Sequence, residues 1–261
     1  MTRNTIRQLA LLLLLSATLP ALAFDSALDL KPVFEATVAR RLTLPEAEQH
    51  YYAELVRYQL QQAGLANLPS QYLLLIDRSS KVQAALLLWL GDKDQVELIG
   101  AAPVSTGKNN GFEYFETPLG LFEHSRHHLD FRAEGTKNQL GLMGYGVKGM
   151  RVYDFGWVNA RKTWVEEVGQ MRLQLHSTDP KYLERKLGTR QSKGCVRIAA
   201  DLNTLLDHYG ILDADYESAQ TEPHIAALLD PSRVVTPWAG RYMLIVDSRR
   251  VTRPTWAALP K

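Results

Sequence analysis

The sequence predicts a mostly β chain that begins with a helical segment. From residue 71 onward, short apolar runs alternate with polar or glycine-containing turns, which is typical of neighbouring strands. Residues 24–70 differ, because their apolar side chains recur at helical spacing. The length suits one main domain with additions at both ends. We place this domain at 71–210, the helical segment at 24–70 and a C-terminal extension with a late strand at 211–261.

Residues 1–23 have the features of a secretory signal peptide. Arg3 and Arg7 precede an unbroken Leu/Ala run over residues 9–15, and Ala21-Leu22-Ala23 matches the small-x-small pattern before a cleavage site. We therefore expect cleavage after Ala23 and export to the periplasm. The alternative is an uncleaved N-terminal anchor. It fits less well, because polar residues and a proline interrupt the apolar run.

The charge of the chain argues against nucleic acid as a partner. The full chain has 30 basic and 28 acidic residues, for a formal net charge of +2. Arg3 and Arg7 are the only charged residues within 1–23, so removing this segment leaves 28 residues of each sign and no net charge. The sequence also contains no long run of lysine and arginine.

A long helix is predicted within the N-terminal segment. Thr43 and Glu46 have the spacing of a capping box, and Gly64 fits a C-terminal cap. The apolar residues predicted to share one helical face are Ala47, Tyr51, Leu55 and Tyr58. We expect this helix to pack on the domain as an appendage. The alternative is that it forms a wall of a substrate groove.

The region from residue 71 begins with a predicted β-hairpin. Apolar runs at 72–76 and 82–90 flank a short polar turn, and a third strand is predicted over 96–104. Residues 171–175 alternate apolar with polar side chains and place His176 at the end of a strand. The other predicted elements are a strand at 150–153, helices at 199–209 and 224–229, and a strand at 242–246.

Residues 124–150 are polar and contain several glycines, which indicates an irregular insertion near a site or a mobile lid. His124, His127 and His128 lie at its start. A zinc site needs at least three suitable ligands in a defined geometry, and no matching acidic or cysteine residues accompany these histidines. We therefore expect a surface or lid role for them, and no metal site.

Cys195 is the only cysteine, and it lies in a chain that begins with an export signal. Structural cysteines of exported proteins usually form pairs, so a single one indicates a reactive thiol. A thiol has a pKa near ~8.5 and needs a base or a positive environment to react as the thiolate. His176 is the best-placed base, because two adjacent strand ends would bring it beside Cys195.

The residues around Cys195 suit acyl transfer. Gly194 permits close approach of a substrate, and the N–H groups of Gly194 and Cys195 are candidates to hold an oxyanion. Arg197 adds a positive charge that would hold the thiolate or a substrate carboxylate.

The ordered residues His176, Gly188, Ser192, Gly194, Cys195, Val196 and Arg197 resemble the signature of the YkuD-type L,D-transpeptidases. Residues 104–108 and 117–122 resemble a second landmark of that family, and the hairpin that begins near Tyr72 resembles its opening strands. The resemblance covers roughly residues 72–209.

This resemblance implies a β-sandwich whose active site opens onto a groove. It implies that Cys195 attacks a peptidoglycan stem peptide, releases a terminal D-amino acid and forms a thioester, which an amine of a second stem resolves. His176 would act as base and then as acid, while Ser192 would orient the loop or the histidine. The family needs no metal or organic cofactor, and carbapenem-type β-lactams acylate its cysteine.

The sequence departs from the family pattern at two positions. Ser177 stands where the family usually has glycine, and Lys193 stands where it has a second histidine. We expect Ser177 to narrow the groove and Lys193 to tune substrate choice. The predicted substrate-binding residues are thus Arg197, Lys193, Ser177 and Thr178.

Three alternatives to transpeptidation stay open at this point. Water would replace the amine in a peptidoglycan carboxypeptidase or amidase on the same scaffold. A non-catalytic wall-binding module would keep the fold, but the paired His176 and Cys195 argue against it. A general secreted cysteine protease is disfavoured by the Ser-x-Gly-Cys-x-Arg pattern at 192–197 and by the strand-rich layout.

Overall fold

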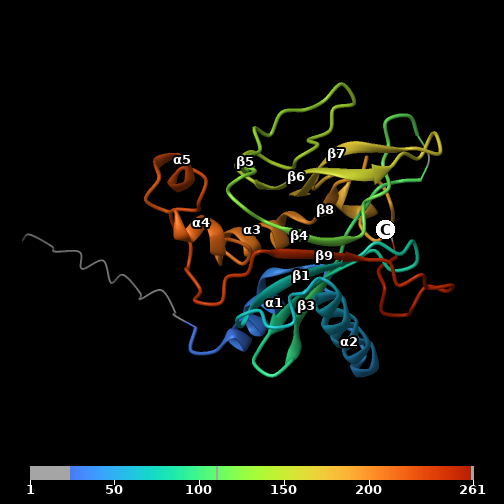
Figure 1. Ribbon diagram of the computed structural model, residues 1–261. Helices are drawn as coiled ribbons and strands as arrows, with labels where there is room; N and C mark the ends of the chain where they lie inside the picture. The colour runs from blue at the N-terminus through green and yellow to red at the C-terminus, as the bar shows by residue number, and fades with distance from the viewer. Residues whose placement is uncertain (1–23, 110, 260–261) are drawn as a thin grey trace, which may run out of the picture.

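The computed structural model describes residues 24–109 and 111–259, and the predicted signal peptide lies outside the described residues. The fold is rich in β-structure, as predicted, and contains two mixed sheets (Figure 1). One sheet has the strand order β3-β2-β1-β9-β4 and the other has the order β5-β6-β7-β8. The strands are β1 (Gln71–Asp77), β2 (Ala84–Leu90), β3 (Val96–Pro103), β4 (Gly120–Glu123), β5 (Phe131–Arg132), β6 (Arg151–Arg161), β7 (Val168–Ser177), β8 (Val196–Ile198) and β9 (Tyr242–Val246). The helices are η1 (Ala27–Asp29), α1 (Leu30–Thr37), α2 (Glu46–Gln62), η2 (Glu184–Lys186), α3 (Ala200–His208), α4 (Ala214–Ser218) and α5 (Pro223–Ala226).

The predicted hairpin is confirmed, since β1 and β2 pair antiparallel in one continuous register. Both strands are apolar throughout because both of their faces are covered. In β1, Leu74 and Ile76 point into a core shared with the four-stranded sheet. Leu73 and Leu75 point to the opposite face and pack in a second core with residues of α2. Figure 1 shows α2 beneath the five-stranded sheet and the second sheet above it.

The late strand predicted at 242–246 is confirmed as β9, and it occupies an interior position in the five-stranded sheet. It runs parallel to β1 and pairs antiparallel with β4 on its other side. The C-terminal segment after residue 210 therefore supplies a strand to the same sheet as the opening hairpin. In Figure 1 this red strand lies between the N-terminal strand β1 and the green strand β4.

Helix α2 differs from its prediction at its start and in its buried face. It begins at Glu46 after Pro45, so Thr43 does not cap it, whereas Gly64 follows its C-terminal end with φ +72° as predicted. The face that packs on the sheet consists of Tyr52, Ala53, Val56 and Leu60, not the predicted set. The rotation is set by Tyr52, whose hydroxyl donates a 2.6 Å hydrogen bond to buried Asp77. Tyr58, predicted to face inward, is 56% exposed.

A buried group of charged residues joins the irregular segment after β4 to β6 and to the chain after α3. Arg151 donates hydrogen bonds to Asp130 at 2.7 Å and to both carboxylate oxygens of Asp213 at 3.0 Å. Burial alone would lower the pKa of Arg151, but the carboxylates outweigh it and raise that pKa well above its usual value. This ion-pair network fixes the segments that surround the second sheet.

The prediction of a surface or lid role is wrong for His124, whose side chain is fully buried in this network. One ring nitrogen lies 2.9 Å from Asp130 and the other lies 2.8 Å from the carbonyl of Leu212. Burial lowers the pKa of His124, but Asp130 and Asp213 outweigh burial and raise it. His127 is exposed and His128 is half-buried. In the part of the chain that the structure describes, no three His, Cys, Asp or Glu side chains form a group suited to a metal ion.

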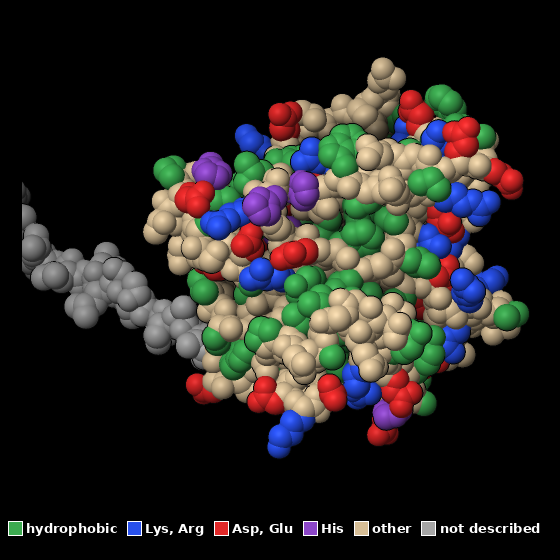
Figure 2. Space-filling view, viewed as in Figure 1, with side chains coloured by type: hydrophobic (Ala, Val, Ile, Leu, Met, Phe, Trp, Pro, Cys, Tyr) green, Lys and Arg blue, Asp and Glu red, His purple; other side chains and the backbone are tan. Residues whose placement is uncertain are grey.

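The rest of 124–150 contains the short strand β5 and is otherwise made of turns, as the sequence predicts. Acidic and basic side chains are interspersed on the face of the molecule seen in Figure 2. None of the helices within residues 24–109 and 111–259 has the length and apolar character needed to cross a membrane.

Candidate active site

The predicted pair His176 and Cys195 lies on one face of the four-stranded sheet. Strands β7 and β8 run parallel, with Leu175 paired to Val196, and these two side chains point into the core. Because alternate residues of a strand point to opposite faces, their neighbours point outward on the same side. The residues on this face, opposite to Leu175 and Val196, are Arg172, Gln174 and His176 from β7 and Cys195 and Arg197 beside them. Cys195 directly precedes β8, so the register of β7 and β8 makes it a diagonal neighbour of His176.

The turn before Cys195 requires glycine at position 194. Gly194 has φ +140°, and a Cβ there would lie 2.7 Å from the sulfur of Met171. Ser192 closes the turn, because its Oγ accepts a hydrogen bond from the Gly194 N–H at 3.1 Å and donates one to the Cys195 carbonyl at 2.5 Å. Ser192 thus orients the loop, as expected. The prediction that the Gly194 N–H serves an oxyanion is wrong for this arrangement, because Ser192 occupies it.

Two segments that precede the turn in the sequence, around Thr106 and Thr117, hold it in place by hydrogen bonds. The Lys108 N–H donates to the carbonyl of Ser192 at 2.9 Å, and the Ser192 N–H donates to the carbonyl of Thr106 at 3.0 Å. Thr117 donates through Oγ1 to the carbonyl of Gly194 at 2.6 Å and accepts the N–H of Gly107 at 2.8 Å. With the Gly194 carbonyl fixed toward Thr117, the N–H of the same peptide, that of Cys195, points the opposite way. The segments at 104–108 and 117–122 therefore hold the turn, and Thr117 orients the Gly194–Cys195 peptide plane.

His176 is held in one tautomer. Its Nδ1 lies 2.6 Å from the main-chain carbonyl of Ser177, and since a carbonyl only accepts, Nδ1 carries the proton. The unprotonated nitrogen is then Nε2, which is free to take up a proton. Burial and, secondarily, the charge of Arg197 lower the pKa of His176 to about 3, despite the favourable carbonyl of Ser177. The imidazole is therefore neutral in the free protein.

Cys195 is half-buried, and its Sγ lies 3.5 Å from the carbonyl oxygen of Arg172. Burial raises the pKa of the Cys195 thiol to about 11. The N–H of Gln174 and the charge of Arg197 act in the opposite direction but do not offset burial. At neutral pH the site therefore holds a neutral thiol and a neutral imidazole, not an ion pair.

Tyr145, from the irregular segment, lies against the pair. Its ring contacts the ring of His176 edge-on, with centroids 4.8 Å apart, and its hydroxyl donates to Oε1 of Gln174 at 3.0 Å. Burial and, secondarily, the nearby Cys195 raise the pKa of Tyr145. Part of the 124–150 insertion is thus next to the site, as one of the two sequence-based alternatives proposed.

The four predicted substrate-binding residues differ in accessibility. Lys193 is exposed, with its Nζ 3.5 Å from Glu113, and Arg197 is half-buried, with one Nη donating to the carbonyl of Gln191 at 3.1 Å. Ser177 and Thr178 are fully buried. The prediction that these two side chains contact substrate is therefore wrong for this arrangement, because the Ser177 hydroxyl instead binds the carbonyl of Tyr145.

Sequence reasoning missed several residues that complete the site. These are Thr117, Tyr145, Asp154, Arg172 and Gln174. The alternation of apolar and polar residues over 171–175 puts Arg172 and Gln174 on the same face as His176, so these two residues could have been predicted to lie near the site. The contact of Tyr145 with the site could not be predicted from the sequence, because an irregular loop has no periodicity that indicates its contacts. Only the glycines on either side of Tyr145 mark this position.

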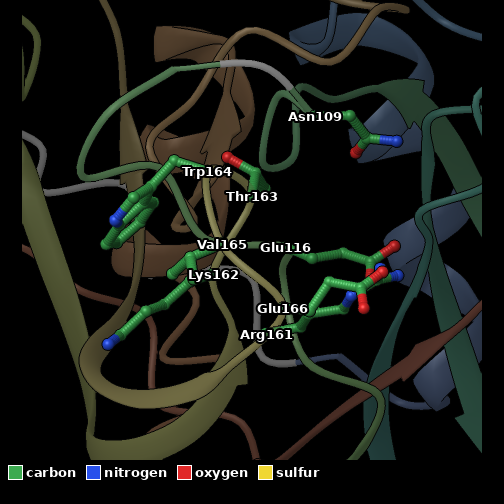
Figure 3. A pocket seen from close by; sticks show the side chains of 8 residues that line it. All are labelled: Asn109, Glu116, Arg161, Lys162, Thr163, Trp164, Val165 and Glu166. Carbon is green, nitrogen blue, oxygen red and sulfur yellow. The ribbon is translucent and has the colours of Figure 1, made fainter.

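A separate pocket of about 360 Å³ lies beside the turn between β6 and β7. Figure 3 shows Lys162 and Trp164 on one side and Glu116, Arg161 and Glu166 on the other. The remaining lining residues are Asn109, Thr163 and Val165. None of the predicted site residues lines it, so we treat it as distinct from the candidate active site.

Comparison with known families identifies the domain that carries this site. The YkuD family model, described as the L,D-transpeptidase catalytic domain, matches residues 66–213. The chain therefore belongs to the YkuD family and contains the catalytic domain of an L,D-transpeptidase-type enzyme, a class that acts on peptidoglycan. A search of curated proteins finds no match to this chain.

Proposed function

We propose that this protein is a periplasmic L,D-transpeptidase in which Cys195 forms a thioester with a peptidoglycan stem peptide and passes the acyl group to an amine. The observation that carries this proposal is the shared face of His176, on β7, and Cys195, directly before β8, within the matched domain. The two sheets and their common core are consistent with the β-sandwich of the family.

The reaction begins from the neutral pair. As Sγ of Cys195 attacks the carbonyl carbon of the donor amide, its proton passes to Nε2 of His176, and the carbonyl electrons move to oxygen. When the C–N bond breaks, His176 returns the proton to the departing amine of the terminal D-amino acid. The acceptor amine then attacks the thioester, gives its proton to His176, and the thiol is restored as the C–S bond breaks.

The oxyanion would be held by the N–H of Cys195. Thr117 fixes the Gly194–Cys195 peptide plane that carries this donor, because it holds the Gly194 carbonyl, and Ser192 holds the carbonyl of the next peptide. The donor therefore need not reorient during the reaction. This arrangement replaces the role that the sequence gave to the Gly194 N–H.

The choice between an amine and water as acceptor depends on what reaches the thioester. Tyr145 covers His176 and lies next to Cys195, which limits the entry of water on that side. We therefore favour transfer to an amine over hydrolysis, either as crosslink formation or as exchange of a D-amino acid.

Mass spectrometry of muropeptides tests this proposal. Purified sacculi are incubated with residues 24–261 or with the same chain carrying Cys195→Ala. New crosslinked dimers, or stems that carry an added D-amino acid, support transfer when the variant does not form them. Trimmed monomers alone identify a hydrolase, and no change in either sample indicates a non-catalytic module. N-terminal sequencing of the exported protein tests the signal peptide, with Phe24 as the expected first residue.

A further inference from the structure

An acidic and a basic residue lie together on the outer face of the sheet beside Cys195. Asp154 of β6 is paired in register with Gln174 of β7, and Arg172 lies two positions before Gln174 on the same face. The main-chain carbonyl of Arg172 is the group that lies 3.5 Å from the Cys195 sulfur. The main chain of Arg172 is thus in contact with the candidate nucleophile, and its side chain extends over the sheet to Asp154.

The side chain of Asp154 is buried, and both of its carboxylate oxygens accept hydrogen bonds. One of its oxygens accepts hydrogen bonds from Arg172 Nε at 2.7 Å and from Gln174 Nε2 at 2.9 Å, while the other accepts the N–H of Gly156 at 2.8 Å. A carboxylate with three donors is fixed in orientation. Asp154 therefore holds the guanidinium of Arg172 by its Nε and leaves the two terminal nitrogens pointing away from it.

The terminal nitrogens of Arg172 remain available. A guanidinium has five N–H donors, and within the described residues only the Nε–H of Arg172 has a hydrogen-bond partner. The side chain is 42% exposed, although its carboxylate partner is buried. The result is a partly exposed cation that a buried carboxylate holds through Nε and whose terminal donors have no partner within the described residues, which suits bidentate binding of a carboxylate.

The other two cations near Cys195 are less suited to this role. Arg197 has its Nε buried without a partner and one Nη bound to the carbonyl of Gln191, so it points into the protein. Lys193 already lies beside Glu113 and over the ring of Tyr114. Of these three cations, Arg172 is the one that is held by a buried carboxylate and keeps terminal donors without a partner within the described residues.

We propose that Arg172 binds a free carboxylate of the acyl donor next to the bond that Cys195 attacks, and that Asp154 positions Arg172 for this contact. The inference rests on the proposed function and narrows its substrate class to donors with a free carboxylate beside the scissile amide. Donors in which that carboxylate is amidated are poor substrates, because they lack the charge that the guanidinium binds.

Alkylation of Cys195 tests the position of the charge without any peptidoglycan reaction. Iodoacetate and iodoacetamide have similar shapes but differ by one negative charge, and the ratio of their rates cancels differences in thiolate fraction. Two unit charges about 4 Å apart in water interact enough to change this ratio about fivefold. We expect the iodoacetate-to-iodoacetamide ratio to fall by about this factor in Arg172→Gln and to be retained in Arg172→Lys.

Lys162→Gln is the matched control, because Lys162 is also a cation paired with a carboxylate but lies in the turn after β6. Its ratio is expected to equal that of the unmodified protein. An unchanged ratio in Arg172→Gln would overturn the proposal, whether or not the protein forms crosslinks. If Arg172→Gln fails to fold, the ratio is measured at low and high salt in the unmodified protein and in Arg172→Lys. A ratio that does not change with salt in either protein would overturn the proposal, because salt screens the attraction of a nearby cation.

A pair of stem-peptide donors, one with the free carboxylate and one with its amide, tests the substrate class. We expect kcat/KM to favour the free acid about tenfold in the unmodified protein and to be nearly equal for the two donors in Arg172→Gln. Asp154→Asn is expected to reduce the preference mainly through KM, and Asp154→Glu to restore part of it. A preference that Arg172→Gln leaves intact overturns the inference. If neither donor reacts while the alkylation ratio still falls, the proposed function fails and the position assigned to Arg172 stands.

Discussion

The hydroxyl of Ser177 donates a 3.0 Å hydrogen bond to the main-chain carbonyl of Tyr145, which ties the irregular segment to the strand that carries His176. The contact is close, since a Cβ on Gly146 would lie 1.9 Å from the Ser177 oxygen, and Gly146 has φ +86°. Asp179 supports the same segment by accepting the N–H of Met143 at 3.1 Å. Ser177, which stands where the family pattern usually has glycine, thus holds Tyr145 against His176.

Replacing Ser177 with glycine is expected to loosen this segment. Loss of one hydrogen bond of about 1 kcal/mol should lower hydrogen-exchange protection across residues 141–147 by about fivefold. Ser177→Ala should have a similar effect, because it removes only the hydroxyl, whereas Ser218→Ala on the exposed surface should have none. Equal protection in all four proteins would show that Ser177 does not hold the segment.

The pH dependence of thiol alkylation should follow the raised pKa of Cys195. Because only the thiolate reacts and its pKa is about 11, the rate with iodoacetamide should rise about tenfold per pH unit from pH 7 to pH 10. A stable thiolate–imidazolium pair would instead give a rate that levels off near neutral pH. Stopped-flow or mass-spectrometric alkylation rates distinguish the two, with Cys195→Ala as the blank.

The buried neutral His176 should make folding sensitive to acid. Its pKa is about 3 in the folded protein against 6.5 in the reference state, so the unfolded chain binds more protons between these values. Its contribution to stability is complete above pH 6.5 and is lost as the pH falls toward 3, at up to about 1.4 kcal/mol per unit. Urea unfolding of His176→Gln should show a shallower loss between pH 6 and pH 4. Parallel curves for the two proteins would contradict this expectation.

The sequence predicted the parts of the fold that depend on local periodicity. The hairpin of β1 and β2 and the late strand β9 follow from short apolar runs, and the strand that ends at His176 follows from the alternation of apolar and polar residues. The rotation of α2 could not be predicted, because it depends on a hydrogen bond from Tyr52 to Asp77 in another element. Nor did periodicity indicate that β9 lies beside β1, since strand order is decided by tertiary packing.

The site was predictable where chemistry and spacing coincide and not where it depends on contacts between segments. His176 and Cys195 were found because a lone thiol needs a base. The oxyanion donor was partly misassigned, because the bond from the Gly194 N–H to Ser192 is visible only in three dimensions. The burial of His124 was missed for a similar reason, since its partners Asp130 and Leu212 come from separate parts of the chain.

Loss of Arg151 should destabilise the protein more than loss of any exposed arginine. Arg151→Met leaves Asp130 and Asp213 buried without their cation, and breaking a buried pair in this way costs about 3–5 kcal/mol. Denaturant unfolding should show this loss, while Arg241→Met, which removes an exposed pair with Glu123, should change stability by less than about 1 kcal/mol.

Thr117 should affect catalysis more than stability, because it orients the Gly194–Cys195 peptide from behind. Thr117→Val removes the hydroxyl that donates to the Gly194 carbonyl and accepts from Gly107, at a cost of about 1–3 kcal/mol in unfolding free energy. If the Cys195 N–H holds the oxyanion, the freed peptide plane should lower kcat by about 100-fold with little change in KM. Thr117→Ser keeps the hydroxyl and should retain most of the activity. A Thr117→Val protein that is destabilised but keeps its kcat would show that the bond from Thr117 to the Gly194 carbonyl is not needed to orient this peptide plane.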